Sequence, residues 1–127
     1  MSYRQDGIGR TIHDLLRMAG IIMTGAFQEK YKQPKFIENG AQEGWQRQLL
    51  LLIDKGEINK AENELLERIE TEKETGALDR VTLEMALGVY GYMNEKEDAF
   101  LERNGFSREE ILEGIQGLLI LGGIELP

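Results

Sequence analysis

The chain has 127 residues, a length typical of one domain and long enough to bury a hydrophobic core without disulfides. It contains no Cys and one His, which excludes zinc–thiolate sites, iron–sulfur clusters and thiol catalysis. Its net charge of −8 disfavours nucleic acid as a partner. The sequence shows no apolar stretch of about 20 residues and no secretion or lipidation motif, so we expect a cytoplasmic protein without metal or cofactor.

Apolar residues three and four apart predict an all-α single domain over 1–127, with five helices and no sheet. The first segment, 1–27, is predicted as a basic amphipathic helix that begins near residue 5. This helix has more apolar residues than one stripe accommodates, and such an excess is typical of an interface. The residues that we expect to face a partner are Met18, Ile21, Ile22 and Phe27.

Residues 28–40 predict a connector that Tyr31, Phe36 and Ile37 attach to the core. A second helix is predicted over 41–55, and because the run 49–53 is wholly apolar we expect it to be central in the fold. Gly56 suits the left-handed residue at a helix C-terminus. A third helix up to residue 75 then completes an antiparallel hairpin over 41–75, with the other helices covering its two sides.

Two C-terminal helices are predicted over 79–121. The first spans 79–103, with a possible bend in its polar stretch 94–98, and Asn104-Gly105 ends it. The pattern Ser107-Arg108-Glu109-Glu110 predicts a capping box that starts the last helix, flanked by Phe106 and Ile111 as a hydrophobic staple. Gly114 and Gly117 are predicted to permit close helix packing, and Gly122-Gly123 ends the helix.

The hairpin resembles the tetratricopeptide helical pair, which has a large aromatic early in its first helix, a Gly turn, and an Ala at the closest approach. The residues that carry this resemblance are Trp45, Leu49, Leu52, Gly56, Ala61 and Leu65. One repeat period of 34 residues later, Asp79, Tyr90 and Glu95 stand where Trp, Gly and Ala are required. The sequence therefore predicts one such hairpin and no repeat array.

The whole chain resembles an uncharacterised family of short bacterial helical proteins, a domain of unknown function. The segments that carry this resemblance are 5–12, 56–62 and 104–111. The resemblance implies no activity, and it transfers no functional residue to this sequence.

Few residues favour catalysis. His13 and Asp14 are adjacent in a predicted helix, where side chains about 100° apart cannot form a hydrogen-bonded dyad. The carboxylates of the third helix, including Glu62, predict a solvated acidic face, and one His cannot supply a di-iron bundle. An unrecognised carboxylate site that includes Glu84 or Glu102 is the alternative that would make the protein an enzyme or a ligand-binding protein.

The charges are unevenly distributed. Residues 1–35 hold six basic and three acidic residues, a balance of +3, whereas the remainder holds nine basic and twenty acidic residues, a balance of −11. We expect a non-catalytic protein–protein interaction or self-association module, whose partner is a protein or a second copy. Docking of the basic first helix on an anionic membrane surface is the alternative.

Overall fold

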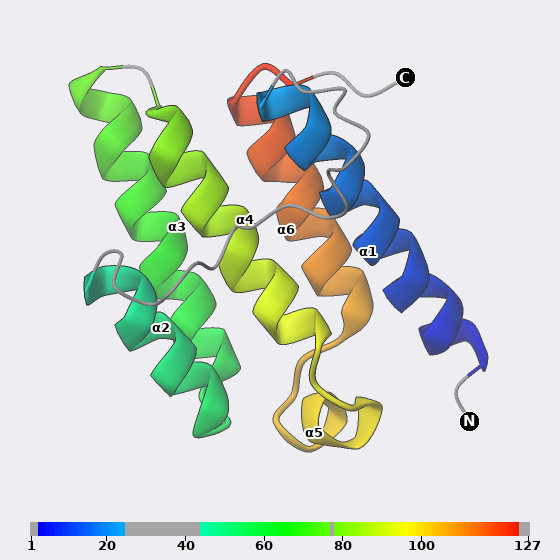
Figure 1. Cartoon of the computed structure of the whole chain (residues 1–127). Helices are drawn as coiled ribbons and strands as arrows, with labels where there is room; N and C mark the ends of the chain where they lie inside the picture. The colour runs from blue at the N-terminus through cyan, green and yellow to red at the C-terminus, as the bar shows by residue number, and fades with distance from the viewer. Residues whose placement is uncertain (1–2, 25–43, 77, 125–127) are drawn as a thin grey trace.

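The computed structural model describes residues 3–24, 44–76 and 78–124, and these form six α-helices and no β-strand (Figure 1). The helices are α1 (Tyr3–Thr24), α2 (Gly44–Asp54), α3 (Ile58–Thr75), α4 (Arg80–Asn94), α5 (Asp98–Arg103) and α6 (Arg108–Leu121). The predicted all-α class is confirmed for these residues. Phe27 and the predicted connector 28–40, with Tyr31, Phe36 and Ile37, lie outside the described residues.

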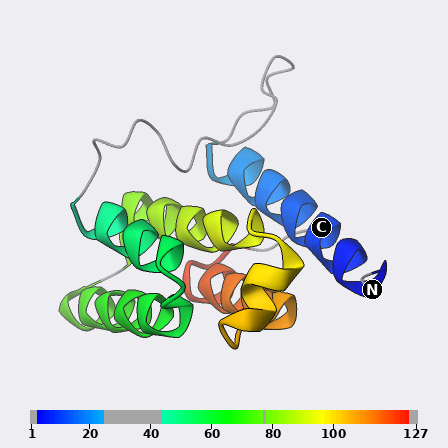
Figure 2. The same cartoon turned by 90° about the horizontal axis from the view of Figure 1, so that it is seen from below.

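Helix α4 lies at the centre of the bundle. It contacts α2 and α3, which also contact each other, and it contacts α1 and α6, which form a second pair (Figures 1 and 2). A helix with neighbours on both sides has to be apolar or small nearly all round. The buried residues of α4 are Thr82, Leu83, Met85, Ala86, Leu87, Gly88, Val89, Tyr90 and Met93.

The expectation that the 41–75 hairpin forms the centre of the fold is wrong. Helix α2 packs on α3 and α4 at one side of the bundle. In its apolar run, Leu49 and Ile53 are buried, but Leu51 is 54% exposed. Five consecutive helical residues point in all directions around the axis, so a helix with neighbours on one side exposes part of such a run.

The predicted turn between α2 and α3 is confirmed. Gly56 has a φ of +88°, in the left-handed region that favours Gly. The Gly56 N–H donates to the Ile53 carbonyl and the Glu57 N–H donates to the Leu52 carbonyl, both at 2.9 Å, which completes a Schellman motif. The chain reverses at this motif, so α2 and α3 pack as an antiparallel hairpin (Figure 1).

The helix predicted over 79–103 is two helices, α4 and α5, which raises the number of helices among the described residues from five to six. The helix stops within the polar stretch that predicted a bend. The carbonyl oxygens of Asn94 and Lys96 accept hydrogen bonds from the Arg108 guanidinium at 2.8 and 2.6 Å. A side chain from α6 thus replaces intrahelical donors, and this stabilises the interruption.

Helix α6 begins at the predicted cap. The Ser107 hydroxyl oxygen accepts a hydrogen bond from the Glu110 N–H at 3.2 Å, and the hydroxyl donates to the Glu110 carboxylate at 3.2 Å. Phe106 and Ile111 are both buried in the core, as the predicted staple requires. At the other end of α6, Gly123 has a φ of +71° and ends the helix as predicted.

Gly114 and Gly117 differ in their surroundings. A Cβ atom on Gly114 would overlap Cζ of Tyr90, so α6 makes its close approach to α4 at this residue. Nothing lies within 4 Å of a Cβ atom on Gly117, so the prediction that Gly117 permits close packing is wrong. Both residues are in the same helix, but only Gly114 lies against a side chain of α4.

Candidate functional site

Helix α1 exposes two of the four residues that were expected to face a partner. Met18 and Ile22 lie four residues apart, on one face of the helix, and both are exposed. Ile21 is partly buried, and Phe27 lies outside the described residues. The structure therefore brings Met18 and Ile22 together on the surface and turns Ile21 partly inward.

The C-terminal end of α1 lies beside the end of α6 (Figure 1). Ile22, which is 39% exposed, lines a hollow of about 260 Å³ together with Leu78 and Ile124. Ile120 is 76% exposed, and Leu121 beside it is exposed as well. We give the name apolar end to the aliphatic residues at these two helix ends and define it by Ile22, Leu78, Ile120, Leu121 and Ile124.

Ile120 and Leu121 were not among the residues predicted to face a partner. The same excess of apolar residues that singled out α1 also occurs in the run 118–121 of α6, where Leu118 and Leu119 are buried. Four consecutive apolar residues of a helix cannot all face the protein core when the helix has neighbours on one side only. That excess would have pointed to these two side chains.

The apolar end carries little net charge. Arg80 is the charged residue among those that line the hollow, and its Nε lies 3.6 Å from a carboxylate oxygen of Glu84. The pair lies one turn apart on α4, with the Arg side chain largely exposed. The local charge at this surface is therefore compensated within α4.

The opposite end of α1, α4 and α6 is closed by polar contacts around Arg108. This side chain is 8% exposed, and its Nε donates to Asp98 Oδ1 at 2.9 Å. It also donates to Asn94 Oδ1 at 2.7 Å, and Asn94 in turn donates to the Gly9 carbonyl of α1 at 3.2 Å. We call this network the sealed end and define it by Gly9, Asn94, Lys96, Asp98 and Arg108.

A buried tyrosine and a half-buried carboxylate meet between α3 and α4. The hydroxyl of Tyr90 donates to Glu62 Oε2 at 2.8 Å. Burial raises the pKa of Glu62, and the neighbouring charges of Glu110 and Glu113 raise it further against the opposing effect of the Tyr90 hydrogen bond. The prediction that Glu62 belongs to a fully solvated face is wrong, because it lies next to the buried Ala61 and reaches Tyr90.

A third polar contact joins α2 to the end of α4. Asp54 Oδ1 accepts hydrogen bonds from Lys96 Nζ at 2.7 Å and from the Tyr92 hydroxyl at 2.8 Å. The hydrogen bond from Lys96 lowers the pKa of Asp54 against the opposing effect of burial, and the hydrogen bond from Tyr92 adds to the lowering. This cluster lies near the surface and stabilises the charged form of the carboxylate.

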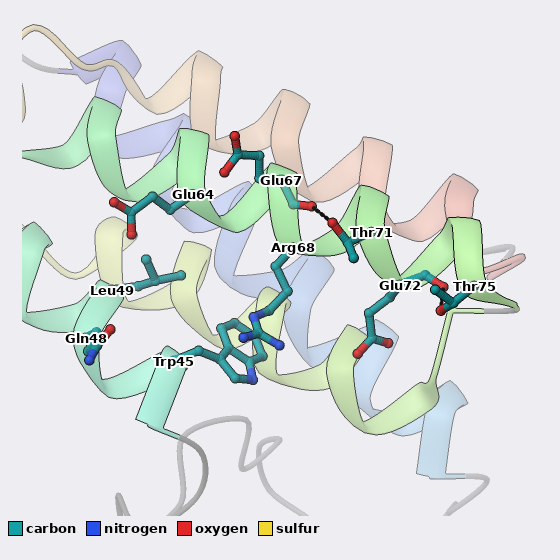
Figure 3. Close-up of a pocket in the computed structure, with 9 residues that line it drawn as sticks. All are labelled: Trp45, Gln48, Leu49, Glu64, Glu67, Arg68, Thr71, Glu72 and Thr75. Carbon is teal, nitrogen blue, oxygen red and sulfur yellow. Dashed lines mark hydrogen bonds between the residues drawn. The ribbon is translucent and has the colours of Figure 1, made fainter.

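A groove of about 760 Å³ runs between α2 and α3 (Figure 3). The guanidinium of Arg68, on α3, lies over the indole of Trp45, on α2, with Cζ 4.8 Å from the ring centroid. We call this the Trp45 groove. The residues that line it are Trp45, Gln48, Leu49, Glu64, Glu67, Arg68, Thr71, Glu72 and Thr75.

The residues that were considered for catalysis lie on three different helices, α1, α4 and α5. His13 Nδ1 and Asp14 Oδ1 are 4.0 Å apart, beyond hydrogen-bonding distance, and both side chains are more than half exposed. Glu102 is exposed, and Glu84 pairs with Arg80. Within residues 3–24, 44–76 and 78–124, no three metal-ligating side chains are grouped to hold an ion. None of the described helices has the length and hydropathy to cross a membrane.

The fold defines an all-helical bundle in which a central helix separates two helix pairs. Residues 2–121 match the family of unknown function DUF6483, so the chain belongs to that family. This match confirms the resemblance to a domain of unknown function that the segments 5–12, 56–62 and 104–111 indicate. No curated protein and no solved structure matches the chain.

Proposed function

We propose that the protein is a non-catalytic interaction module that self-associates through its apolar end. The observation that supports this function most is the exposure of Ile120, 76%, beside the exposed Leu121 at the end of α6. Aliphatic side chains gain about 25 cal/mol per Å² when they leave water, and exposed clusters of them are typical of protein interfaces. The net charge of −8 makes copies of the chain repel each other in general, so association requires a surface of low charge.

The chemistry of the apolar end favours a second copy as its partner. The Arg80–Glu84 pair compensates the charge at this surface, so a second copy meets no repulsion there. Two identical aliphatic surfaces complement each other across a two-fold axis, as in most homodimers. A charged partner would gain little from this surface, because the described residues that line the hollow include no uncompensated charge.

The absence of catalysis is part of the same proposal. It is supported by a sequence with no Cys and a single His, whose ring nitrogen does not reach Asp14. A tetratricopeptide-like character of the α2–α3 hairpin is a further part. It is supported by the Trp45, Gly56 and Ala61 spacing, and Ala61 is fully buried against its neighbours.

Light scattering across micromolar concentrations tests the proposal. We expect the wild-type chain to form a dimer and Ile120→Glu to be a monomer, because a buried carboxylate would oppose its own copy across the interface. Leu51→Glu is the matched control, since Leu51 is also an exposed aliphatic residue but lies on α2. A wild-type chain that stays monomeric, or equal effects of the two variants, would reject self-association through the apolar end.

Membrane docking is the second candidate, and the surface of α1 favours it. Arg10 and Arg17 are exposed on the helix that also exposes Met18 and Ile22. A basic amphipathic helix binds anionic lipid surfaces through both kinds of residue. Sedimentation of the protein with anionic vesicles that decreases with added salt and with Arg17→Glu would support membrane docking. The absence of vesicle binding at low ionic strength would reject it.

A further inference from the structure

We propose that the Trp45 groove binds a basic segment of a partner protein, and that Arg68 occupies the position of the partner's cation when the groove is free. This interaction is separate from self-association, because the groove lies between α2 and α3, whereas the apolar end is centred on α1 and α6.

The groove is long enough for an extended segment. Beside the main hollow of about 760 Å³ lies a second one of about 430 Å³, and Trp45, Arg68 and Glu72 line both. The second hollow continues to Asp79 and to the exposed Val81 at the start of α4. The two hollows therefore form one trough that passes the indole of Trp45.

The charge of the trough favours cations. Glu64, Glu67, Glu72 and Asp79 line the two hollows, and among the described lining residues Arg68 is the one that carries a positive charge. In the part of the chain that the structure describes, none of these four carboxylates forms an ion pair. A concave surface with one sign of charge raises the local concentration of oppositely charged groups.

The Trp45–Arg68 contact shows which group fits the centre of the trough. A guanidinium already lies over the indole, at 4.8 Å from the ring centroid to Cζ (Figure 3). Stacking on the face of Trp is the preferred arrangement for Arg and Lys cations. Arg68 is exposed and forms no salt bridge with the described residues, so its side chain can leave the ring without breaking an ion pair to any of them.

In this proposal Arg68 competes with the partner's cation, whereas an ordinary binding residue would attract the partner. A basic segment competes with Arg68 for the indole face and is repelled by its charge. An acidic or phosphorylated segment would instead be attracted by Arg68 and repelled by Glu64, Glu67 and Glu72. The two classes of partner therefore predict opposite effects of removing Arg68.

Trp45 is the single Trp of the chain, so its fluorescence reports on the groove directly. The probe is a short synthetic peptide of alternating arginine and alanine. We expect a saturable change in Trp45 emission that weakens with added salt, and no change with the corresponding glutamate–alanine peptide. The absence of a saturable change with the basic peptide would overturn the proposal.

Three variants make the test specific to the groove. We expect Arg68→Ala to raise the affinity about threefold and Glu72→Gln to lower it about threefold, the size of one exposed charge interaction. Glu102→Gln is the matched control, because it removes an exposed carboxylate on α5 that lies outside the groove. Weaker binding by Arg68→Ala, or an equal loss with Glu102→Gln, would contradict the proposal.

A fourth variant tests the aromatic contact. We expect Trp45→Leu to weaken binding of a fluorescently labelled arginine–alanine peptide, measured by anisotropy, because Leu keeps an apolar side chain without a ring face. Circular dichroism checks that the variant remains helical. Unchanged affinity in a folded Trp45→Leu protein would show that the peptide does not use the indole.

Discussion

The three helices α1, α4 and α6 end in opposite ways at the two ends of the bundle. At the sealed end, Arg108 joins the end of α4 to Asp98, and Asn94 extends the network to Gly9 of α1. At the apolar end, Ile22 of α1 and Ile120 and Leu121 of α6 are exposed. Polar contacts thus hold one end of the bundle together, whereas aliphatic side chains at the other end remain exposed.

The sealed end is complete in itself. Among the described residues, no buried side-chain polar atom lacks a hydrogen-bond partner. A fully bonded network gains nothing from a ligand, whereas an exposed aliphatic side chain gains free energy when a partner covers it. The sealed end is therefore expected to affect stability, and the apolar end is expected to affect association.

The largest effect on stability is expected when the Arg108 network is removed. We expect Arg108→Ala to lower the free energy of unfolding by about 3 kcal/mol, because the carbonyls of Asn94 and Lys96 and the Asp98 carboxylate lose their donor. Arg80→Ala removes an arginine at the opposite end, where its ion pair is exposed, and should change stability by less than about 1 kcal/mol. Urea denaturation of both variants measures the difference, and equal effects would contradict the comparison.

A smaller effect is expected midway between the two ends. Gly114→Ala should destabilise the protein by about 2 kcal/mol, because the new methyl group would overlap the Tyr90 ring. Gly117→Ala, in the same helix, should stabilise the protein by about 0.5–1 kcal/mol, because it meets nothing and lowers the entropy of the unfolded chain. Thermal unfolding compares the two variants, and a stabilising Gly114→Ala would show that α4 and α6 are further apart at this point.

The two carboxylates that bind tyrosines of α4 should change stability with pH in opposite directions. The pKa of Asp54 is lowered below its ordinary 3.8, so its contribution is present above that value and is lost as the pH falls through the folded-state pKa. The pKa of Glu62 is raised above its ordinary 4.5, so its contribution is present below 4.5 and is lost as the pH rises through the folded-state pKa.

Substitution separates these two pH dependences. Glu62→Gln keeps an oxygen that accepts the Tyr90 hydrogen bond, and it should remove the loss of stability above pH 4.5. Asp54→Asn should instead remove the loss below pH 3.8. Urea unfolding midpoints measured from acid to neutral pH test both, and profiles parallel to that of the wild-type chain would contradict the assigned pKa directions.

The smallest effect on stability is expected at the apolar end. In dilute solution, where the chain is monomeric, Ile120→Glu should change the free energy of unfolding by less than about 0.5 kcal/mol, because Ile120 is exposed and supports no core contact. Urea denaturation at low concentration measures this value. A loss of 2 kcal/mol or more would show that Ile120 belongs to the core of its own chain.

The helix ends could be predicted from the sequence because their chemistry is local. Gly56 and Ser107 form bonds with residues within four positions, and those positions are visible in the sequence. The break after Asn94 could not be predicted in the same way, because Arg108 stabilises it from fourteen residues away. The polar stretch indicates that the helix can bend, and the hydrogen bonds from the distant Arg108 stabilise its end there.

The candidate sites also show that local patterns could be predicted from the sequence, whereas contacts between distant helices could not. The exposure of Met18 and Ile22 was predictable from the excess of apolar residues on one helix. The contact between Tyr90 and Glu62 and the trough around Trp45 each depend on residues from two helices more than twenty positions apart. Helical spacing places a residue on a face, but only the packing of α2, α3 and α4 determines which faces meet.

The dependence of thermal stability on protein concentration tests the central claim most directly. If the apolar end is covered by a second copy, the unfolding midpoint of the wild-type chain rises with concentration, because association stabilises the folded state. The midpoint of Ile120→Glu should then be independent of concentration. A wild-type midpoint that does not change over a hundredfold dilution, from a concentration well above the dissociation constant that light scattering gives, would contradict the account.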